Sequence, residues 1–237
     1  MNDSGAGPAV RGAASGVAQG AVAAEAAASE AAATAEQPRP RVLVVFATKH
    51  GSTMEVAQTV AEELRDAGVA ADVASTAGGA DPSGYHAVVV AAPMIMGWHK
   101  EAVRFLRRNR RQLSSVPTAY FVTAASLTKT GEDAVRDVPV DLDPWLAKAP
   151  KRADKLSRKE RYATPEHYAG GILKKTRPVR PRCIAFFAGS LDMTKMNIFE
   201  QLFVMLIVGA SPGDGRHWQA IRDWAASLPA LLAADEA

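Results

Sequence analysis

From Arg41 onward, short apolar segments of strand length alternate with segments that have a helical pattern. The first apolar run, Arg41–Phe46, is followed by a loop and then by Val56, Val60 and Leu64, which recur every four residues. Such alternation favours an α/β protein with a doubly wound parallel sheet, in which right-handed crossovers place helices on both faces. The expected strands are 41–46, 69–75, 87–92, 118–124 and 182–188, and the later expected helices are 99–113 and 216–232.

Residues 1–40 are set apart from this pattern by their composition. Fifteen of them are alanine, and none is aromatic. Because Ala, Gly and Ser bury too little apolar area to offset the entropy lost on ordering, we expect a disordered tail followed by one domain over residues 41–237. The tail carries a net charge of −2 and the remainder +5, so the basic excess belongs to the folded part.

The cellular compartment is indicated by the cysteine count, by the length of the apolar runs and by the pattern of the N-terminus. The single cysteine, Cys183, excludes an internal disulfide and a four-thiolate zinc site, and no metal site is expected. No apolar run reaches the ~18 residues that span a bilayer, and the N-terminus lacks the pattern of a secretory signal. We therefore expect a cytoplasmic protein.

The loop after the first strand is the most informative segment. Thr48, Lys49, His50, Gly51, Ser52 and Thr53 precede the first helix. A phosphate placed there meets free backbone N–H groups, the positive end of the helix dipole and several hydroxyl donors. The spacing fits neither the P-loop nor the G-x-G-x-x-G fingerprint, and a hydroxyl-rich loop suits a terminal monophosphate. The alternative is that Ser and Thr merely cap the helix.

T-x-x-G-x-T after a first strand resembles the FMN phosphate loop of flavodoxins. That resemblance implies a flavodoxin-like five-stranded parallel sheet of order 2-1-3-4-5, with FMN at the switch point between strands one and three. The loops after the third and fifth strands then flank the flavin ring. The first of these loops contains Pro93, Met94, Ile95, Met96, Gly97 and Trp98, and the second contains Ala188, Gly189, Ser190 and Leu191.

The sequence is similar, more narrowly, to one flavodoxin-type subgroup, the bacterial menaquinone-dependent protoporphyrinogen IX dehydrogenases. The shared features are V-x-x-A-T-x-x-G-S-T, G-W-H-K, R-C-I-A-F-F-A-G-S-L and G-D-G-R-x-W. This resemblance implies an FMN-dependent oxidoreductase of haem biosynthesis, with a tetrapyrrole as substrate and a membrane quinone as acceptor. Two alternatives stay open: a flavodoxin-type electron carrier without enzymatic activity, and an FMN-free interaction module.

Two insertions distinguish this chain from a simple carrier. Residues 126–180 form a basic insertion before the fifth strand, and residues 190–213 form an insertion with the apolar helical run 198–208. Connections in α/β units normally need ~2 to 6 residues besides the crossover helix, so long insertions are candidates for function. The apolar run is expected either to contact the membrane interface or a quinone, or to be a core helix.

The basic insertion has a strongly positive charge. Residues 148–182 carry twelve Lys and Arg against three acidic residues. Such a run is expected to bind the inner face of an anionic membrane peripherally, to bind the propionates of a tetrapyrrole, or to be a solvated arm. Nucleic acid is not expected as a partner, because no nucleic-acid-binding motif accompanies the charge.

Three side chains near the expected flavin have more than one interpretation. Trp98 would cover the flavin ring, or it would pack over the following helix. His99 would donate a hydrogen bond to flavin or substrate, or it would be a surface or capping residue at the start of the helix. Cys183 lies in an apolar run and is expected to be structural. No residue stands out as a general base, so the sequence assigns no catalytic side chain.

Overall fold

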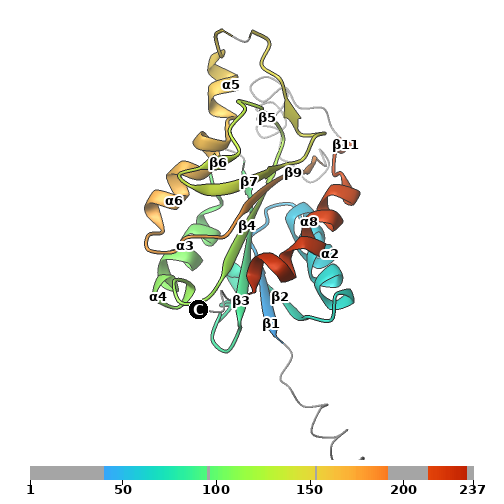
Figure 1. Ribbon diagram of the computed structural model, residues 1–237, viewed down its shortest axis with the longest axis vertical. Coiled ribbons are helices and arrows are strands. Elements are labelled where there is room, and N and C mark those ends of the chain that lie inside the picture. The colour runs from blue at the N-terminus through green and yellow to red at the C-terminus, as the bar shows by residue number, and fades with distance from the viewer. Residues whose placement is uncertain (1–39, 95–96, 153, 192–212, 234–237) are drawn as a thin grey trace, which may run out of the picture. The chain divides into compact units, whose positions relative to one another are not determined.

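A parallel sheet forms the centre of the molecule, as the computed structural model in Figure 1 shows. The structure describes residues 40–94, 97–152, 154–191 and 213–233. The predicted tail, apart from Pro40, and the apolar run 198–208 lie outside these residues. None of the described helices is both long and apolar enough to cross a membrane.

The strands follow the order β2-β1-β3-β4-β9-β7-β6, and within it only β6 and β7 pair antiparallel. Their bounds are β1 Arg41–Phe46, β2 Ala70–Ser75, β3 Ala87–Met94, β4 Thr118–Ala124, β6 Ala134–Val135, β7 Val138–Leu142 and β9 Ile184–Ala188. The first five strands of this order are the predicted flavodoxin-like 2-1-3-4-5 arrangement, which is thereby confirmed.

The predicted number of five strands was wrong, because the basic insertion adds two. Val140, Asp141 and Leu142 of β7 pair with the outer side of β9, which would otherwise be the edge of the sheet. Arg136 and Asp137 both have positive φ (51° and 63°), which is the backbone of a two-residue hairpin turn between β6 and β7.

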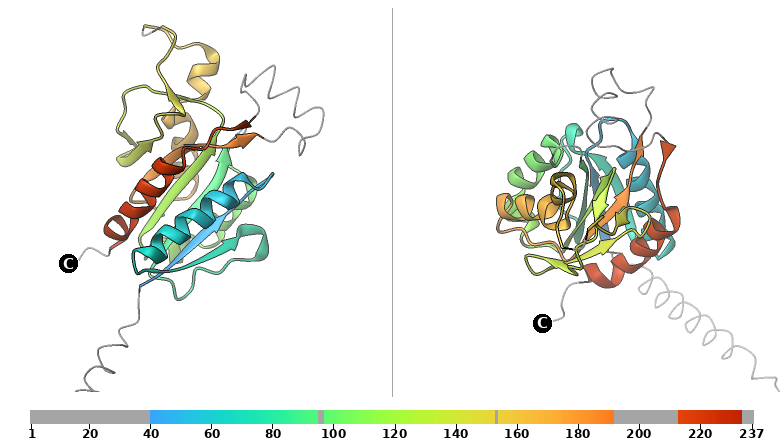
Figure 2. Two further views of the ribbon diagram at one scale, coloured as in Figure 1. Left: turned by 90° about the vertical axis from the view of Figure 1, so that its right-hand side faces the viewer. Right: turned by 90° about the horizontal axis from the view of Figure 1, so that it is seen from above.

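The helices cover the two faces of the sheet. On one face, α2 (Ser52–Asp66) and α8 (Trp218–Leu232) lie side by side (Figure 2, left) and pack against every second residue of β1 and β9. On the other face, α3 (Lys100–Arg108), α4 (Arg110–Leu113) and α6 (Gly171–Lys175) pack over β3, β4 and β9. The predicted helix 99–113 is therefore two helices, divided at Asn109.

The basic insertion contributes further short elements, which lie above the carboxyl ends of the strands in Figure 1. They are β5 Leu127–Thr128, β8 Ala147–Lys148, α5 Arg158–Tyr162 and the π-helical turn η2 Glu166–Gly170. β5 pairs with β8 in parallel. Three short elements lie outside the insertion: the 3₁₀ turn η1 Thr76–Gly78, and the antiparallel pair β10 Ser190–Leu191 and β11 Gly213–Asp214.

The register of the sheet brings the predicted loops to one edge. Met94 of β3 lies beside Ala124 of β4, which in turn lies beside Ala188 of β9. The loops that follow these strands, and the loop that follows β1, therefore emerge together. In open α/β sheets this edge is where ligands bind.

Candidate functional site

The loop from Thr48 to Thr53 connects β1 to α2 in a form suited to an anion. Gly51 is the N-cap of α2, with φ of 94°, and no side chain caps the helix. The hydroxyls therefore do not act as N-caps, contrary to the alternative considered for them. The uncapped N-terminus of a 15-residue helix leaves the positive end of its dipole facing this loop.

Two of the hydroxyls are held in place by backbone donors. Thr48 Oγ1 accepts the Gly51 N–H at 2.9 Å, and Ser52 Oγ accepts the Ser190 N–H at 3.2 Å. Because each hydroxyl acts as an acceptor in these bonds, each retains its own proton for donation to a ligand. The second bond also ties this loop to β10.

The Thr53 hydroxyl is engaged within the protein. It shares a hydrogen bond of 2.8 Å with Thr123 Oγ1, and Thr53 is 1% exposed. This bond links the first turn of α2 to the carboxyl end of β4. Of the three expected hydroxyls, those of Thr48 and Ser52 are therefore the ones available to donate a hydrogen bond to a ligand.

A cavity of about 770 Å³ opens at this edge of the sheet. That volume lies within the range of ~300 to 1,000 Å³ typical of sites for small molecules and cofactors. Eleven of the predicted site residues line it: Thr48, Lys49, His50, Ser52, Thr53, Pro93, Met94, Gly97, Trp98, Gly189 and Ser190. The three predicted loops therefore meet at one cavity.

The remaining predicted residues have other positions. Gly51 caps α2, and Ala188 is the buried last residue of β9, whose N–H bonds to Asp143. Leu191 belongs to β10, while Ile95 and Met96 lie outside the described residues. His99 is the N-cap residue of α3 but makes no side-chain capping bond.

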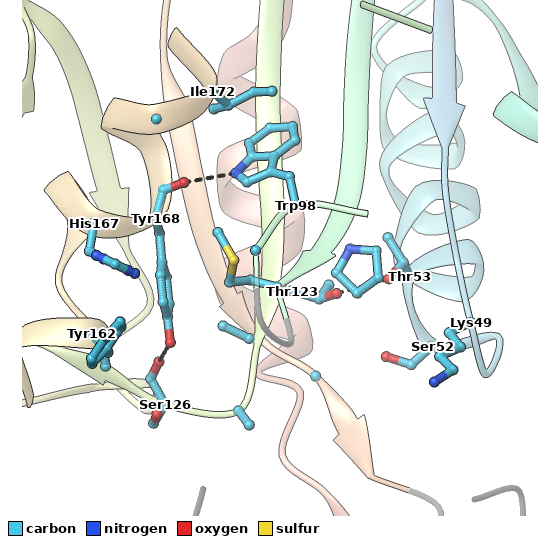
Figure 3. A pocket seen from close by; sticks show the side chains of 18 of the residues that line it. Lys49, Ser52, Thr53, Trp98, Thr123, Ser126, Tyr162, His167, Tyr168 and Ile172 are labelled. Carbon is cyan, nitrogen blue, oxygen red and sulfur yellow. Dashed lines mark hydrogen bonds between the residues drawn. The ribbon is translucent and has the colours of Figure 1, made fainter. Parts of the chain in front are cut away.

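Trp98 is fixed by contacts on two sides and also lines the cavity. Its indole N–H donates to the Tyr168 carbonyl at 3.0 Å, and its ring meets the Tyr120 ring edge-on, with centroids 5.5 Å apart. Figure 3 shows Trp98 between Ser52 and Thr53 on one side and Tyr168 on the other. Trp98 also packs against a small apolar cluster that includes Ala102 of the following helix, α3, as one interpretation expected. Its cover of a flavin ring stays a prediction.

Part of the cavity wall comes from the end of β4 and from the basic insertion, and these residues were not predicted. Ala124, Ala125 and Ser126 line the cavity, and Tyr168 donates its hydroxyl to the Ser126 carbonyl at 3.1 Å. Burial raises the pKa of Tyr168, so the hydroxyl stays protonated in this bond. Besides Ser126, the insertion supplies Arg158, Lys159, Tyr162, Ala163, His167, Tyr168, Gly171, Ile172 and Lys175. Residues 124–126 could have been predicted to line the cavity, because they lie at the carboxyl end of a central strand.

A buried carboxylate holds the end of β9 next to the cavity. Asp143 follows β7, its side chain is fully buried, and its oxygens accept the N–H groups of Trp145 (2.9 Å) and Ala188 (3.2 Å). His217 Nδ1 lies 3.2 Å from Asp143 Oδ1, and the His217 ring stacks on the Trp145 ring at 4.1 Å. Asp143 therefore joins the insertion, β9 and the start of α8.

The G-D-G-R segment has a structural role among the described residues. Arg216, 9% exposed in its side chain, forms ion pairs with Asp214 (2.7 Å) and with Glu55 of α2, and it lies over the Trp218 ring. Hydrogen bonds from Arg216 lower the pKa of Asp214. Cys183 is also structural, since it is buried and burial raises the pKa of its thiol to about 12.

Gly51→Ala is expected to lower the free energy of unfolding by about 1 to 2 kcal/mol, because a left-handed backbone is unfavourable for alanine. A Cβ at this position would meet no atom within 4 Å, so the loss comes from backbone conformation and not from a clash. Urea unfolding measures it. Gly51→Asn is the control and should lose less, because Asn tolerates this region; equal stability of wild type and Gly51→Ala would contradict the assigned conformation.

Glu160 should titrate far below an ordinary glutamate. Its carboxylate accepts the N–H groups of Lys151 and Ser157, both at 2.7 Å, and these bonds lower its pKa from 4.5 to about 2. Because the folded pKa is the lower one, its contribution to stability is complete above about pH 4.5 and is lost as the pH falls toward 2. The amide NMR shifts of Ser157 and Lys151 should therefore change with a midpoint near pH 2. This titration should vanish in Glu160→Gln; a midpoint near 4.5 would show that α5 is not capped in this way.

Comparison with known proteins agrees with the topology of the sheet. The model of the flavodoxin domain family matches residues 43–216. The protoporphyrinogen IX dehydrogenase (quinone) of Escherichia coli strain K12 is 26% identical over 191 residues, covering 78% of this chain and 88% of that protein.

Several solved structures align with this chain at low identity. A flavodoxin from the domain Archaea has a TM-score of 0.41 and 9% identity, covering 81% of this chain and 98% of that one. The rubredoxin oxygen:oxidoreductase of Desulfovibrio gigas has a TM-score of 0.43 and 15% identity, covering 90% of this chain; our chain spans 42% of that protein. With the family model covering most of the described sheet, and the strand order 2-1-3-4-5 within it, the chain belongs to the flavodoxin domain family.

Proposed function

We propose that this protein is an FMN-dependent oxidoreductase that converts protoporphyrinogen IX to protoporphyrin IX and passes the electrons to a quinone. The observation that carries the proposal is the cavity itself. It joins an uncapped helix N-terminus and two donor hydroxyls to an aromatic-lined chamber at the carboxyl edge of the sheet. The specific substrate and acceptor come from the printed name of the bacterial relative.

The residues of the cavity fit FMN. Thr48, Ser52 and the N-terminus of α2 would hold the terminal phosphate, which can accept many donors at once. The flavin ring would lie between the segment of Gly97 and Trp98 and that of Gly189 and Ser190, all of which line the cavity. When bound, FMN supplies the redox chemistry, and the protein supplies binding and orientation.

The chain's own residues have three roles in this proposal. The phosphate loop fixes one end of the cofactor, and Trp98, held by Tyr120 and Tyr168, gives a rigid aromatic wall. The insertion forms the side of the cavity opposite the loop 48–53. No side chain is assigned as a general base, so we assign the oxidation to the cofactor and the positioning to the protein.

The overall reaction balances with a two-electron acceptor. Conversion of protoporphyrinogen to protoporphyrin removes six electrons and six protons, so three quinones become three quinols for each macrocycle. With a membrane quinone as acceptor, the protein would work at the inner face of the cell membrane.

The visible spectrum of the purified protein, followed by two assays, tests the proposal. We expect a yellow protein, or an apoprotein that binds added FMN, which forms protoporphyrin with a menaquinone analogue as acceptor. A flavin-containing protein that reduces cytochromes but does not oxidise the porphyrinogen would instead be an electron carrier. A protein that binds no FMN would contradict both the dehydrogenase and the electron carrier. The FMN-free interaction module would then be the remaining alternative.

A further inference from the structure

The cavity has two ends of different chemistry. At one end lie Lys49, Ser52 and Thr53 of the phosphate loop, and at the other lie the aromatic side chains of the basic insertion (Figure 3). Trp98 and Thr123 lie between them. We call the far end the insertion lobe, and define it by Arg158, Tyr162, His167, Tyr168 and Lys175, all of which line the cavity.

The insertion lobe is positively charged and has no acidic counterpart. Among the described residues that line the cavity, there is no Asp or Glu, whereas Arg158, Lys159 and Lys175 all come from the insertion. Arg158 and Lys175 are exposed, and neither forms an ion pair within the described part of the chain. Cations gathered at a cavity without carboxylates favour an anionic ligand.

The same lobe offers aromatic surface next to these cations. Tyr162 is 65% exposed, and its ring meets the His167 ring edge-on, with centroids 4.8 Å apart. His167 in turn lies 6.4 Å from the Tyr168 ring, whose hydroxyl is bonded to Ser126. The exposed Tyr162 ring beside the cavity offers a ligand a large aromatic contact area.

We propose that the insertion lobe is the subsite that selects a carboxylate-bearing macrocycle, with Arg158 and Lys175 pairing its carboxylates and Tyr162, His167 and Tyr168 contacting its ring system. The identification of the macrocycle as a tetrapyrrole rests on the proposed function. The phosphate loop serves the cofactor at the opposite end, so the two anionic groups do not compete. Substrate choice then resides in the insertion and not in the flavodoxin-like core.

Binding of protoporphyrin IX and of its dimethyl ester separates charge recognition from ring contact. We expect the full-length wild-type protein to bind the free diacid more tightly than the uncharged ester, measured by porphyrin fluorescence. In the double variant Arg158→Gln with Lys175→Gln, affinity for the diacid should fall by about tenfold, as two partly exposed ion pairs would give. Affinity for the ester should not change.

Arg161→Gln with Lys174→Gln is the matched control. Arg161 and Lys174 belong to the same two helices as Arg158 and Lys175 and are exposed, but they do not line the cavity. This double variant should bind both porphyrins as wild type does. The lobe variant should also keep the wild-type FMN affinity, which would show that its fold and the cofactor end of the cavity are intact.

The outcomes distinguish the subsite from the proposed function. Equal affinity for diacid and ester, or an equal loss in the lobe and control variants, would overturn the subsite even if the protein oxidises protoporphyrinogen. Charge-selective binding that depends on Arg158 and Lys175, without any oxidation of the porphyrinogen, would support the subsite and overturn the proposed reaction.

Discussion

Replacing both Thr48 and Ser52 with alanine is expected to weaken FMN binding by about two to four orders of magnitude. Each hydroxyl would donate a charge-assisted hydrogen bond to the phosphate, worth about 1.5 to 3 kcal/mol, and about 1.4 kcal/mol corresponds to a tenfold change in affinity. The substitutions also remove the acceptors of the Gly51 and Ser190 N–H groups, which loosens the loop. Titration of the apoprotein with FMN, followed by quenching of flavin fluorescence, measures the effect.

The conservative exchanges Thr48→Ser and Ser52→Thr are the controls. Both keep a hydroxyl at the position that now accepts a backbone N–H, so FMN affinity should stay within about tenfold of wild type. Unchanged affinity in the double alanine variant would refute the placement of the phosphate at this loop.

Asp143→Ala is expected to lower the free energy of unfolding by about 3 to 5 kcal/mol. The carboxylate is fully buried and accepts from two backbone N–H groups and from His217. Removing it leaves the Ala188 N–H buried without its acceptor, and breaking a buried charged network is strongly destabilising. Because Asp143 joins the insertion to β9 and α8, the loss should also loosen the segment that leads to Gly189 and Ser190.

Urea unfolding of Asp143→Ala and of Asp154→Ala measures this difference. Asp154 lies in the same insertion, but it pairs with Arg152 where both side chains are about 70% exposed, so its removal should change stability by about 0.5 kcal/mol or less. Asp143→Asn should fall between wild type and Asp143→Ala, since an amide keeps one acceptor oxygen. A loss below about 1 kcal/mol in Asp143→Ala would show that the insertion does not depend on this contact.

The central strands of the sheet could be predicted because each is a nearly unbroken run of apolar residues. The strands β1, β3, β4 and β9 are nearly continuous apolar runs, as strands covered on both faces are. The strand β7 was not predicted, because Pro139 and Asp141 interrupt a segment of five residues. Its apolar positions Val138, Val140 and Leu142 alternate, and this was the one available signal.

The parts of the candidate site that could be predicted are the loops that directly follow the predicted strands. The segment 48–53 was located from its hydroxyl-rich sequence after the first strand, and the segments 93–98 and 188–191 from the resemblance to flavodoxins. Residues from each segment line the cavity. The part of the cavity wall that comes from the basic insertion could not be predicted. The position of Tyr168 there depends on long-range contacts with Trp98 and Ser126. Nothing in local spacing indicates a contact across seventy residues, such as that between Thr53 and Thr123.

The ratio of quinone reduced to protoporphyrin formed, measured without oxygen, tests the central claim most directly. Oxygen is excluded because porphyrinogens oxidise in air. The FMN-loaded protein should form protoporphyrin while it reduces three quinones for each macrocycle, and the same chain without FMN should form none above the uncatalysed rate. Quinone reduction without porphyrin formation, or porphyrin formation that does not depend on FMN, would contradict an FMN-dependent protoporphyrinogen dehydrogenase.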